Sequence, residues 1–431
     1  MPKQDPMDRT SGFFKKNLET MPHKKRTEYL HRKLRGIIQY GYGHSAAIRN
    51  KLDSVGLKPR DIQKIADLEK LPITKKADLV ELQRTNPPFG GFEGIPISEM
   101  RRIYVSPGPI VEPGEMEYSE LGWAQGMYAG GFRPEDLAVN TFSYHMVPFA
   151  LHMVDNSLNQ NGCVVIPAGV GNTEQQVHIL KKLNVAGFCG TPSFLLAIAE
   201  KAEEMELDLK KDLNLRVGFV AAEMLPESLR SKLEEKFGMI IRQSYGTADI
   251  GCLGYECMHK NGMHIPDDKI VEIVDPVTGK QLGPGKTGEI VATTFNKVYP
   301  LIRFGTGDLS ILTETPCPCG RTSPRLLKIL GRVDQVTKVR GLFVHPGQAD
   351  EVVSKFPWIA RYQVVVTRAE HKDEMTFKIE PREEVSHPET FKEEIERTIR
   401  DVMKVRGGVQ FVARGTIPEG ARKIEDQRTW D

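Results

Sequence analysis

The chain has 431 residues, 39% of them hydrophobic and 27% charged, which is typical of a folded protein with two or more domains. Its 59 lysines and arginines nearly balance 57 aspartates and glutamates, and this argues against a nucleic-acid binder that depends on a concentrated basic face. No apolar run approaches the roughly 20 residues that cross a bilayer, so we expect a cytoplasmic protein with no membrane partner. A homodimer is an open alternative to a monomer.

The first two thirds of the chain predict an α/β domain. Residues 1–85 have helical patterns, and from residue 100 to residue 330 short β-rich runs alternate with helices. This alternation predicts a mostly parallel sheet with helices on both faces and ligand sites at the carboxyl ends of its strands. The predicted strands are 139–142, 163–166, 185–189, 217–221 and 240–243, and the helices between them are 173–183, 193–205 and 227–237.

The pattern changes in the last third. Strands joined by glycine and proline turns predict an antiparallel region over 270–313. A smaller unit follows, with predicted strands at 335–339, 362–367, 375–380 and 409–412 and a helix at 388–403. The fold class is therefore α/β, with a large N-terminal domain of mixed sheets (1–330) and a small α+β C-terminal domain (331–431).

Several polar, glycine-containing segments follow predicted strands. They are Gly190-Thr-Pro-Ser193, Ala221-Ala-Glu223, 243–249, 288–294, 300–308, 331–341 and 415–424. In this order and spacing they resemble the signature blocks of adenylate-forming enzymes, and most of all those of the phenylacetate–CoA ligase family, over essentially the whole length. The resemblance implies a large adenylate-forming domain and a small, mobile C-terminal domain.

The resemblance also implies a reaction. A carboxylic acid, with an aromatic or arylacetic acid as the first choice and a short hydroxy acid as the second, attacks the α-phosphate of ATP and gives an acyl-adenylate and pyrophosphate. The small domain then rotates, and the thiol of coenzyme A displaces AMP. The implied cofactors and substrates of this AMP-forming acid–CoA ligase are ATP/AMP, Mg²⁺, the acid and coenzyme A.

Residue roles follow from the matching motifs. Asp308 is placed like the family aspartate that accepts hydrogen bonds from both ribose hydroxyls, and Arg332 offers a fork of donors to phosphate or ribose oxygens. Asp334 matches the hinge position. Tyr245 would stack near the adenine, with Ala222 and Glu223 forming the rest of that wall. Gly246, Thr247, Ser106 and Gly108 complete the implied nucleotide-binding set.

The implied catalytic residues are Asp249, Arg332 and Lys423. Asp249 would hold Mg²⁺ or the α-phosphate side of the site, although the family usually has the longer glutamate there. Lys423 would supply positive charge to the pentavalent α-phosphate, with Arg422 as its competitor.

The loop that should wrap the β- and γ-phosphates departs from the family pattern. Ser106 and Gly108 persist, but Pro107 and Pro109 have no N–H to donate, and Glu112 brings negative charge toward the phosphates. Two alternatives therefore stay open: a nucleotide- or acyl-CoA-binding protein with weak or no ligase activity, and an acyl-adenylate enzyme with another acceptor. A P-loop phosphotransferase is disfavoured because its Gly-x4-Gly-Lys-Ser/Thr motif does not occur.

Two further groups of residues are candidates for ligand contacts. Phe142, Tyr144, His145 and Phe149 would line the acid pocket, although ordinary core packing is an equally open interpretation. Some members of the family carry a Cys/His set that looks like a zinc site, and here Cys257, His264, Cys317 and Cys319 would form a closed, structural Cys3His tetrahedron. By spacing alone, a glycine/proline turn with incidental thiols is as plausible as metal binding.

Overall fold

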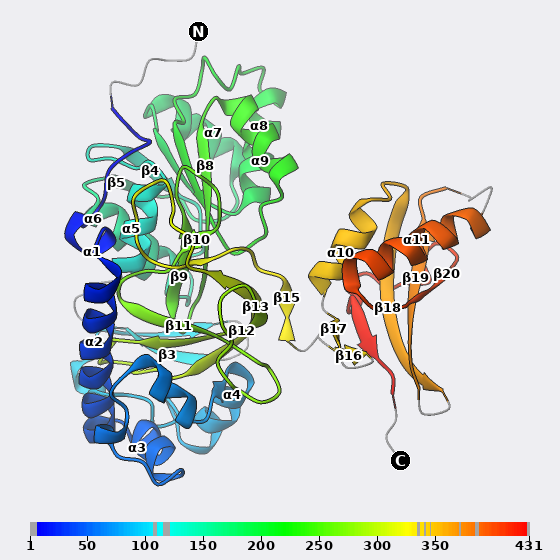
Figure 1. Cartoon of the computed structure of the whole chain (residues 1–431). Helices are drawn as coiled ribbons and strands as arrows, with labels where there is room; N and C mark the ends of the chain where they lie inside the picture. The colour runs from blue at the N-terminus through cyan, green and yellow to red at the C-terminus, as the bar shows by residue number, and fades with distance from the viewer. Residues whose placement is uncertain are drawn as a thin grey trace. The chain divides into compact units, whose positions relative to one another are not determined.

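A computed structural model describes residues 7–106, 110–114, 121–333, 337–339, 342–344, 346–369, 372–383 and 388–428. The chain forms two compact units (Figure 1): the first contains Met1–Thr306 and Ile311–Lys328, and the second contains Gly307–Ser310 and Ile329–Asp431. The predicted boundary at 331 falls just inside the last segment of the second unit, and the functional division into domains stays a prediction.

The N-terminal region is helical, as predicted. Its elements are α1 (Lys16–Glu19), α2 (His23–His44), α3 (Ala46–Asp53), η1 (Pro59–Asp61), η2 (Ile65–Lys70) and α4 (Lys76–Thr85). Helix α2 buries Leu34, Ile37, Ile38 and Gly41, which recur at the spacing of one helical face. Ser45 then ends α2 and caps α3, because its hydroxyl accepts the backbone N–H of Ile48.

The main sheet has the strand order β11-β12-β13-β14-β10-β9-β8-β7-β6-β4-β5. Its parallel part consists of β4 (Leu137–Asn140), β5 (Val164–Pro167), β6 (Gly187–Gly190), β7 (Val217–Val220) and the first half of β8 (Ile240–Thr247). The helices of this region are α5 (Leu121–Ala129), α6 (Asn156–Gln160), α7 (Thr173–Lys182), α8 (Pro192–Glu204) and α9 (Glu227–Phe237). The predicted parallel strands and the helices between them are confirmed to within a few residues.

Strand β8 joins the two parts of the sheet. Its first residues pair with β7 in parallel, whereas Ser244–Thr247 pair with β9 in antiparallel. The antiparallel part contains β9 (Gly251–Glu256), β10 (Met263–His264), β11 (Lys269–Val274), β12 (Thr287–Thr294), β13 (Phe304–Thr313) and β14 (Arg325–Leu326). The short strand β1 (Thr74–Lys75) pairs with β13 in parallel. The antiparallel region predicted over 270–313 is confirmed, and so is the mixed α/β fold class.

A hairpin covers the region of the predicted phosphate loop. It consists of β2 (Arg102–Ser106) and β3 (Ile110–Gly114), after the short helix η3 (Ile97–Glu99). Gln83 of α4 holds β3 by two hydrogen bonds, because its Oε1 accepts the N–H of Val111 and its Nε2 donates to the carbonyl of Val111, both at 2.8 Å. This clamp fixes the position of the hairpin against α4.

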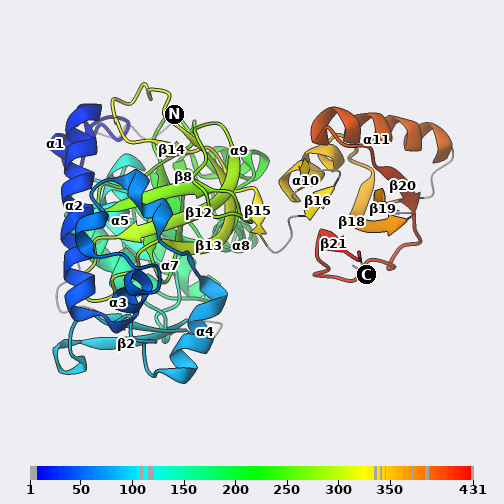
Figure 2. The same ribbon diagram turned by 60° about the horizontal axis from the view of Figure 1, so that its bottom comes forward.

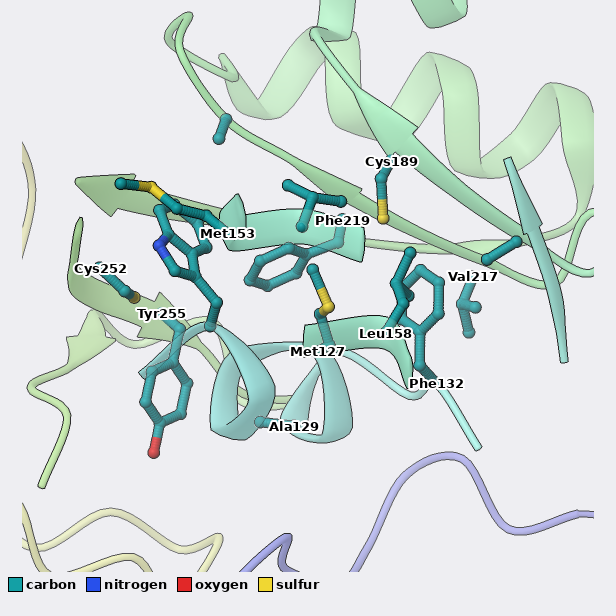
Figure 3. Close-up of a cluster of buried hydrophobic side chains, with 14 of the residues drawn as sticks. Met127, Ala129, Phe132, Met153, Leu158, Cys189, Val217, Phe219, Cys252 and Tyr255 are labelled. Carbon is teal, nitrogen blue, oxygen red and sulfur yellow. The ribbon is translucent and has the colours of Figure 1, made fainter. Parts of the chain in front are cut away.

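The core of the sheet region packs against α5. Figure 3 shows the side chain of Met127, on α5, pointing toward Phe219 of β7, with Phe132 and Tyr255 in the same cluster. All four side chains are buried, and burial of a side chain of this size stabilises the fold by roughly 1.5–3 kcal/mol. The strands whose ends carry the candidate site are therefore held by a packed apolar layer.

The second unit is a small α+β module. A sheet of order β20-β19-β18-β21 lies beside α10 and α11 (Figure 2). Its elements are β15 (Gly331–Arg332), β16 (Thr337–Val339), β17 (Leu342–Val344), α10 (Pro346–Ser354), β18 (Ile359–Ala369), β19 (Lys372–Pro381), α11 (Pro388–Met403), β20 (Gly408–Phe411) and β21 (Ile424–Asp426). The predicted helix at 388–403 matches α11. In the described part of the chain, none of the helices is both long and apolar enough to cross a bilayer.

Candidate active site

The loops after β6 and β7 are tied together by Glu223. The hydroxyl of Ser193 donates to its Oε1 at 2.8 Å, and the N–H of Ser193 donates to its Oε2 at 3.2 Å. A carboxylate at this point also suits the N-terminus of α8, which begins at Pro192. Ala222, beside it, has a positive φ of 69°. The two residues predicted for the adenine wall are thus exposed at the carboxyl end of β7.

Tyr245, Gly246 and Thr247 end strand β8, next to the end of β7. The register against β9 shifts between Tyr245 and Gly246. A Cβ at position 246 would lie 2.4 Å from the carbonyl oxygen of Gly251, so only glycine fits this irregularity. The hydroxyl of Thr247 then accepts the N–H of Ile250 at 3.2 Å and closes the turn that presents Asp249.

Asp249 is buried, and only one of its two carboxylate oxygens makes a hydrogen bond with a described residue. Its Oδ2 accepts a hydrogen bond from the ammonium of Lys76, the first residue of α4, at 2.7 Å, whereas its Oδ1 has no partner among the described residues. The sequence reasoning missed Lys76, which lies 173 positions earlier and carries no motif. An oxygen with free lone pairs is the kind of donor that Mg²⁺ takes from protein, usually from one or two carboxylates together with substrate phosphates. Asp249 therefore has an oxygen available for a ligand, and its catalytic role stays a prediction.

A second buried carboxyl group, that of Glu112 on β3, lies close to Asp249. Its side chain is 4% exposed, and neither carboxylate oxygen makes a hydrogen bond with a described residue. Burial, together with the negative charge of Asp249, raises the pKa of Glu112 to about 8, and the Lys76 ammonium and the nearby Ser106 hydroxyl only partly offset this. Across the hairpin, Tyr104 is its register partner, and the buried Tyr104 hydroxyl also lacks a partner among the described residues.

Both carboxylates line a cavity of about 360 Å³. Its walls come from the β2–β3 hairpin, the segment η4 (Phe149–Asp155), the turn after β8 and the end of β12. The volume is at the small end of the roughly 300–1,000 Å³ that small-molecule sites occupy. Its lining contains three lysines, Lys15, Lys33 and Lys269, and three carboxyl groups, those of Glu112, Asp249 and Asp268. This cavity can accept a small polar molecule.

The four residues predicted for the acid pocket lie elsewhere. Phe142 and Phe149 meet edge to face with ring centroids 4.5 Å apart, and Phe149 also packs against Trp123 at 5.0 Å. The hydroxyl of Tyr144 donates to the carboxylate of Asp155 at 2.9 Å, and His145 is exposed. None of the four is among the described residues that line the cavity, and their role in acid binding stays a prediction.

Asp308 and Arg332 are brought together in the second unit. They are register partners in the pairing of β13 with β15, and Nη1 of Arg332 donates to Oδ1 of Asp308 at 2.9 Å. Gly307 makes this approach possible, because a Cβ there would lie 2.8 Å from Nη2 of Arg332 and its φ is +76°. A carboxylate and a guanidinium side by side offer acceptors to ribose hydroxyls and donors to a phosphate.

Lys423 lies just before β21 and is paired within the second unit. Its ammonium donates to both oxygens of Asp350, at 2.7 and 2.8 Å, and Asp350 also accepts the hydroxyl of Tyr362 at 2.6 Å. Arg422, its competitor, is exposed, and its backbone carbonyl accepts from Gln363 at 3.1 Å. A lysine held in this way has to leave Asp350 before it can neutralise a phosphate.

The remaining predicted positions divide into described and undescribed residues. Ser106 is buried at the end of β2, and its hydroxyl donates to the carbonyl of Ile110 at 3.4 Å, so the hydroxyl is turned into the hairpin. Gly108 and the hinge residue Asp334 lie outside the described residues. Their assigned roles stay predictions.

The cysteine and histidine side chains form one compact cluster. The donor atoms of Cys257, His264, Cys317 and Cys319 all lie within 4.8 Å of one another. The Sγ atoms of Cys257 and Cys317 are 3.7 Å apart, and Sγ of Cys319 is 3.4 Å from Nε2 of His264. Tetrahedral zinc bonds of about 2.3 Å to sulfur and about 2.0–2.1 Å to nitrogen give edges of about 3.8 Å (S to S) and about 3.5 Å (S to N). The donor set fits zinc.

The surroundings of the cluster favour its ligand form. Hydrogen bonding from the Cys257 thiol and from His264 lowers the pKa of Cys319 far below that of a free thiol, and the thiolate is the form that binds metals. Nδ1 of His264 faces the hydroxyl of Ser323 at 3.3 Å, which leaves Nε2 directed at the cluster.

Comparison with known proteins accounts for this arrangement. Residues 126–296 match the family model of AMP-binding enzymes, and residues 341–429 match that of the AMP-binding enzyme C-terminal domain. The phenylacetate-coenzyme A ligase of Thermus thermophilus is 32% identical over 384 residues, which are 86% of this chain and 85% of that protein. The chain belongs to the phenylacetate–CoA ligase family. The predicted family is thereby confirmed, and the chain is an AMP-forming acid–CoA ligase.

Two further matches support the assignment to the phenylacetate–CoA ligase family. The phenylacetate-coenzyme A ligase of Aromatoleum evansii is 31% identical over 420 residues, 92% of this chain and 93% of that protein. A crystal structure of 2-hydroxyisobutyryl-CoA ligase, in an open conformation with 2-HIB-AMP and CoA, matches with a TM-score of 0.86 and 26% identity over 98% of this chain and 96% of that one. Both the large and the small unit of this ligase are therefore represented in relatives.

Proposed function

We propose that this ligase binds its acid in the cavity beside Asp249 and activates it there with ATP. The proposal rests on the position of Asp249, which the family motif assigns to the reacting phosphate and which also lines the cavity. A carboxylate group bound in the cavity would be drawn by the lysines of its wall and would lie near the α-phosphate. An arylacetic acid is the first candidate, since two relatives are named as phenylacetate ligases, and a short hydroxy acid is the second.

The chain's own residues have separate roles in this reaction. Asp249 would hold Mg²⁺, and Lys76 orients that carboxylate through the hydrogen bond to its Oδ2. Bound Mg²⁺ would supply charge neutralisation for the phosphates. Asp308 accepts the ribose hydroxyls and Arg332 donates to the phosphate or ribose. Lys423 stabilises the charge that develops at the α-phosphate once it has left Asp350.

The test is to measure pyrophosphate release and thioester formation with a panel of acids, with and without coenzyme A. We expect both signals with the same acid, and expect Asp249→Asn to lower kcat by about 100-fold or more, as the loss of a transition-state contact does. Asp249→Glu, which restores the residue usual in the family, should retain more activity than Asp249→Asn. Asp53→Ala, which removes a surface ion pair with Lys58, is the matched control. Pyrophosphate release without any thioester would favour another acceptor.

We also infer that the Cys/His cluster holds a structural zinc ion. Three thiolates and one imidazole close a tetrahedron and leave no position open, which is typical of structural and not catalytic sites. The ion would tie the β9–β10 connection to the 317–319 loop, and the chain's folding would depend on it.

A further inference from the structure

The cavity beside Asp249 has several buried polar atoms without partners. Among the described residues, no hydrogen bond is made by the hydroxyl of Tyr104, by either carboxylate oxygen of Glu112, by Oδ1 of Asp249 or by the hydroxyl of Thr294. All four residues line the same cavity, and each is at most 9% exposed. Buried polar groups are nearly always satisfied in folded proteins, so such a concentration indicates a ligand that supplies their partners.

These groups come from three separate parts of the fold. Tyr104 and Glu112 face each other across the β2–β3 hairpin, Asp249 follows β8, and Thr294 ends β12. Gln83 fixes the hairpin through the two hydrogen bonds to Val111, so Glu112 is held in place by its backbone. A pocket for a purely apolar acid would not bury a carboxylate in this way, because an unpaired polar group disfavours folding.

The charges decide what kind of polar group fits. Three lysines and three carboxyl groups line the cavity, so a second full charge on the ligand, of either sign, would meet groups of its own sign. An uncharged hydroxyl both donates and accepts, and it can therefore satisfy an acceptor such as Glu112 and a hydroxyl such as Tyr104 or Thr294 at the same time.

We propose that the acid activated by this ligase carries a hydroxyl group, and that Glu112 and Tyr104 are the residues that select it. This rests on the proposed acid-binding role of the cavity and deepens it.

Matched acid pairs that differ by one hydroxyl test the proposal. The pairs are phenylacetate with 4-hydroxyphenylacetate and isobutyrate with 2-hydroxyisobutyrate, assayed for thioester formation by the full-length enzyme. For at least one pair we expect the hydroxylated acid to have a kcat/KM about 10- to 100-fold higher, because a site with buried polar groups rejects the analogue that leaves them unpaired.

Two variants separate selection from a structural role. Tyr104→Phe removes only an unpartnered hydroxyl, so the fold should stay intact, while the preference for the hydroxylated acid should fall several-fold. Glu112→Leu should bring the ratio to about one or below, because the acceptor for the substrate hydroxyl is lost. The exposed Glu235, on α9, provides the control Glu235→Gln, which should leave the ratio unchanged.

The outcomes are distinguishable. A wild-type enzyme that prefers the plain acid in both pairs, or a ratio that neither Tyr104→Phe nor Glu112→Leu changes, overturns the selection of a hydroxyl while the ligase function stands. If no acid yields a thioester, the proposed function fails, and calorimetric titration of the same pairs into the wild type and Tyr104→Phe decides about the cavity. Equal affinities within each pair would then overturn the inference.

Discussion

The cluster of Cys257, His264, Cys317 and Cys319 gives the sharpest prediction for this protein. Purified wild-type protein should contain close to one zinc ion per chain, and Cys317→Ser should contain almost none, because serine is a poor ligand where a thiolate is required. X-ray absorption at the zinc edge should show three sulfur neighbours at about 2.3 Å and one nitrogen at about 2.0–2.1 Å. The S to S distance of 3.7 Å and the S to N distance of 3.4 Å already match the edges of that tetrahedron.

The loss of zinc should also destabilise the fold by a predictable amount. A metal present at about 1,000 times its dissociation constant stabilises the folded state by about 4 kcal/mol. At roughly 2–4 °C per kcal/mol for a large domain, Cys317→Ser should lower the Tm by about 8–16 °C in calorimetry. Treatment of the wild-type protein with a chelator should lower its Tm to a value similar to that of Cys317→Ser.

The matched control is Cys163→Ser, since Cys163 is equally buried but lies outside the cluster and donates to the carbonyl of Arg133 at 3.3 Å. A serine can keep that hydrogen bond, so this variant should keep its zinc. The reasoning is refuted if wild-type protein carries no stoichiometric zinc, or if both variants have the same metal content and Tm.

Three further substitutions test other parts of the molecule. Asp308→Ala, which removes the carboxylate beside Arg332, should raise the KM for ATP by about 10- to 100-fold in a pyrophosphate-release assay, and an unchanged KM would contradict its role at the ribose. Burial lowers the pKa of Lys51 from 10.5 to about 7, so the unfolded chain binds more protons between these values and stability rises with pH there. Urea unfolding of Lys51→Met should lack this rise, which is roughly 3 kcal/mol between pH 7 and pH 10. Arg230→Met should cost about 3–5 kcal/mol because it leaves the buried Glu256 without its two-pronged partner, and adding Glu256→Met should recover most of that loss.

The parallel part of the sheet was predictable from sequence because its signals are local. Short apolar runs such as 217–221 and 185–189, separated by helices with one apolar face, give strands and helices almost at the observed bounds. The helix at 388–403 has the strongest such periodicity, and its bounds were predicted without error.

What sequence reasoning missed depends on long-range contacts. The ion pair between Lys76 and Asp249 joins residues 173 positions apart, and neither neighbourhood encodes the other. The antiparallel half of β8 was also missed, because a register shift at Gly246 is a property of two strands and not of one. Glu112 was noticed only as a charge near the phosphates, since its burial against Tyr104 follows from hairpin pairing.

The short segment Gly307–Ser310 has a consequence for recombining these ligases. It lies within β13, yet it belongs to the second unit and supplies Asp308, the partner of Arg332. A chimera that takes only the C-terminal piece from a relative, with its crossover at 330, would therefore join Asp308 of one parent to the arginine of another. An active chimera should therefore take residues 307–310 and the chain from 329 onward from the same parent.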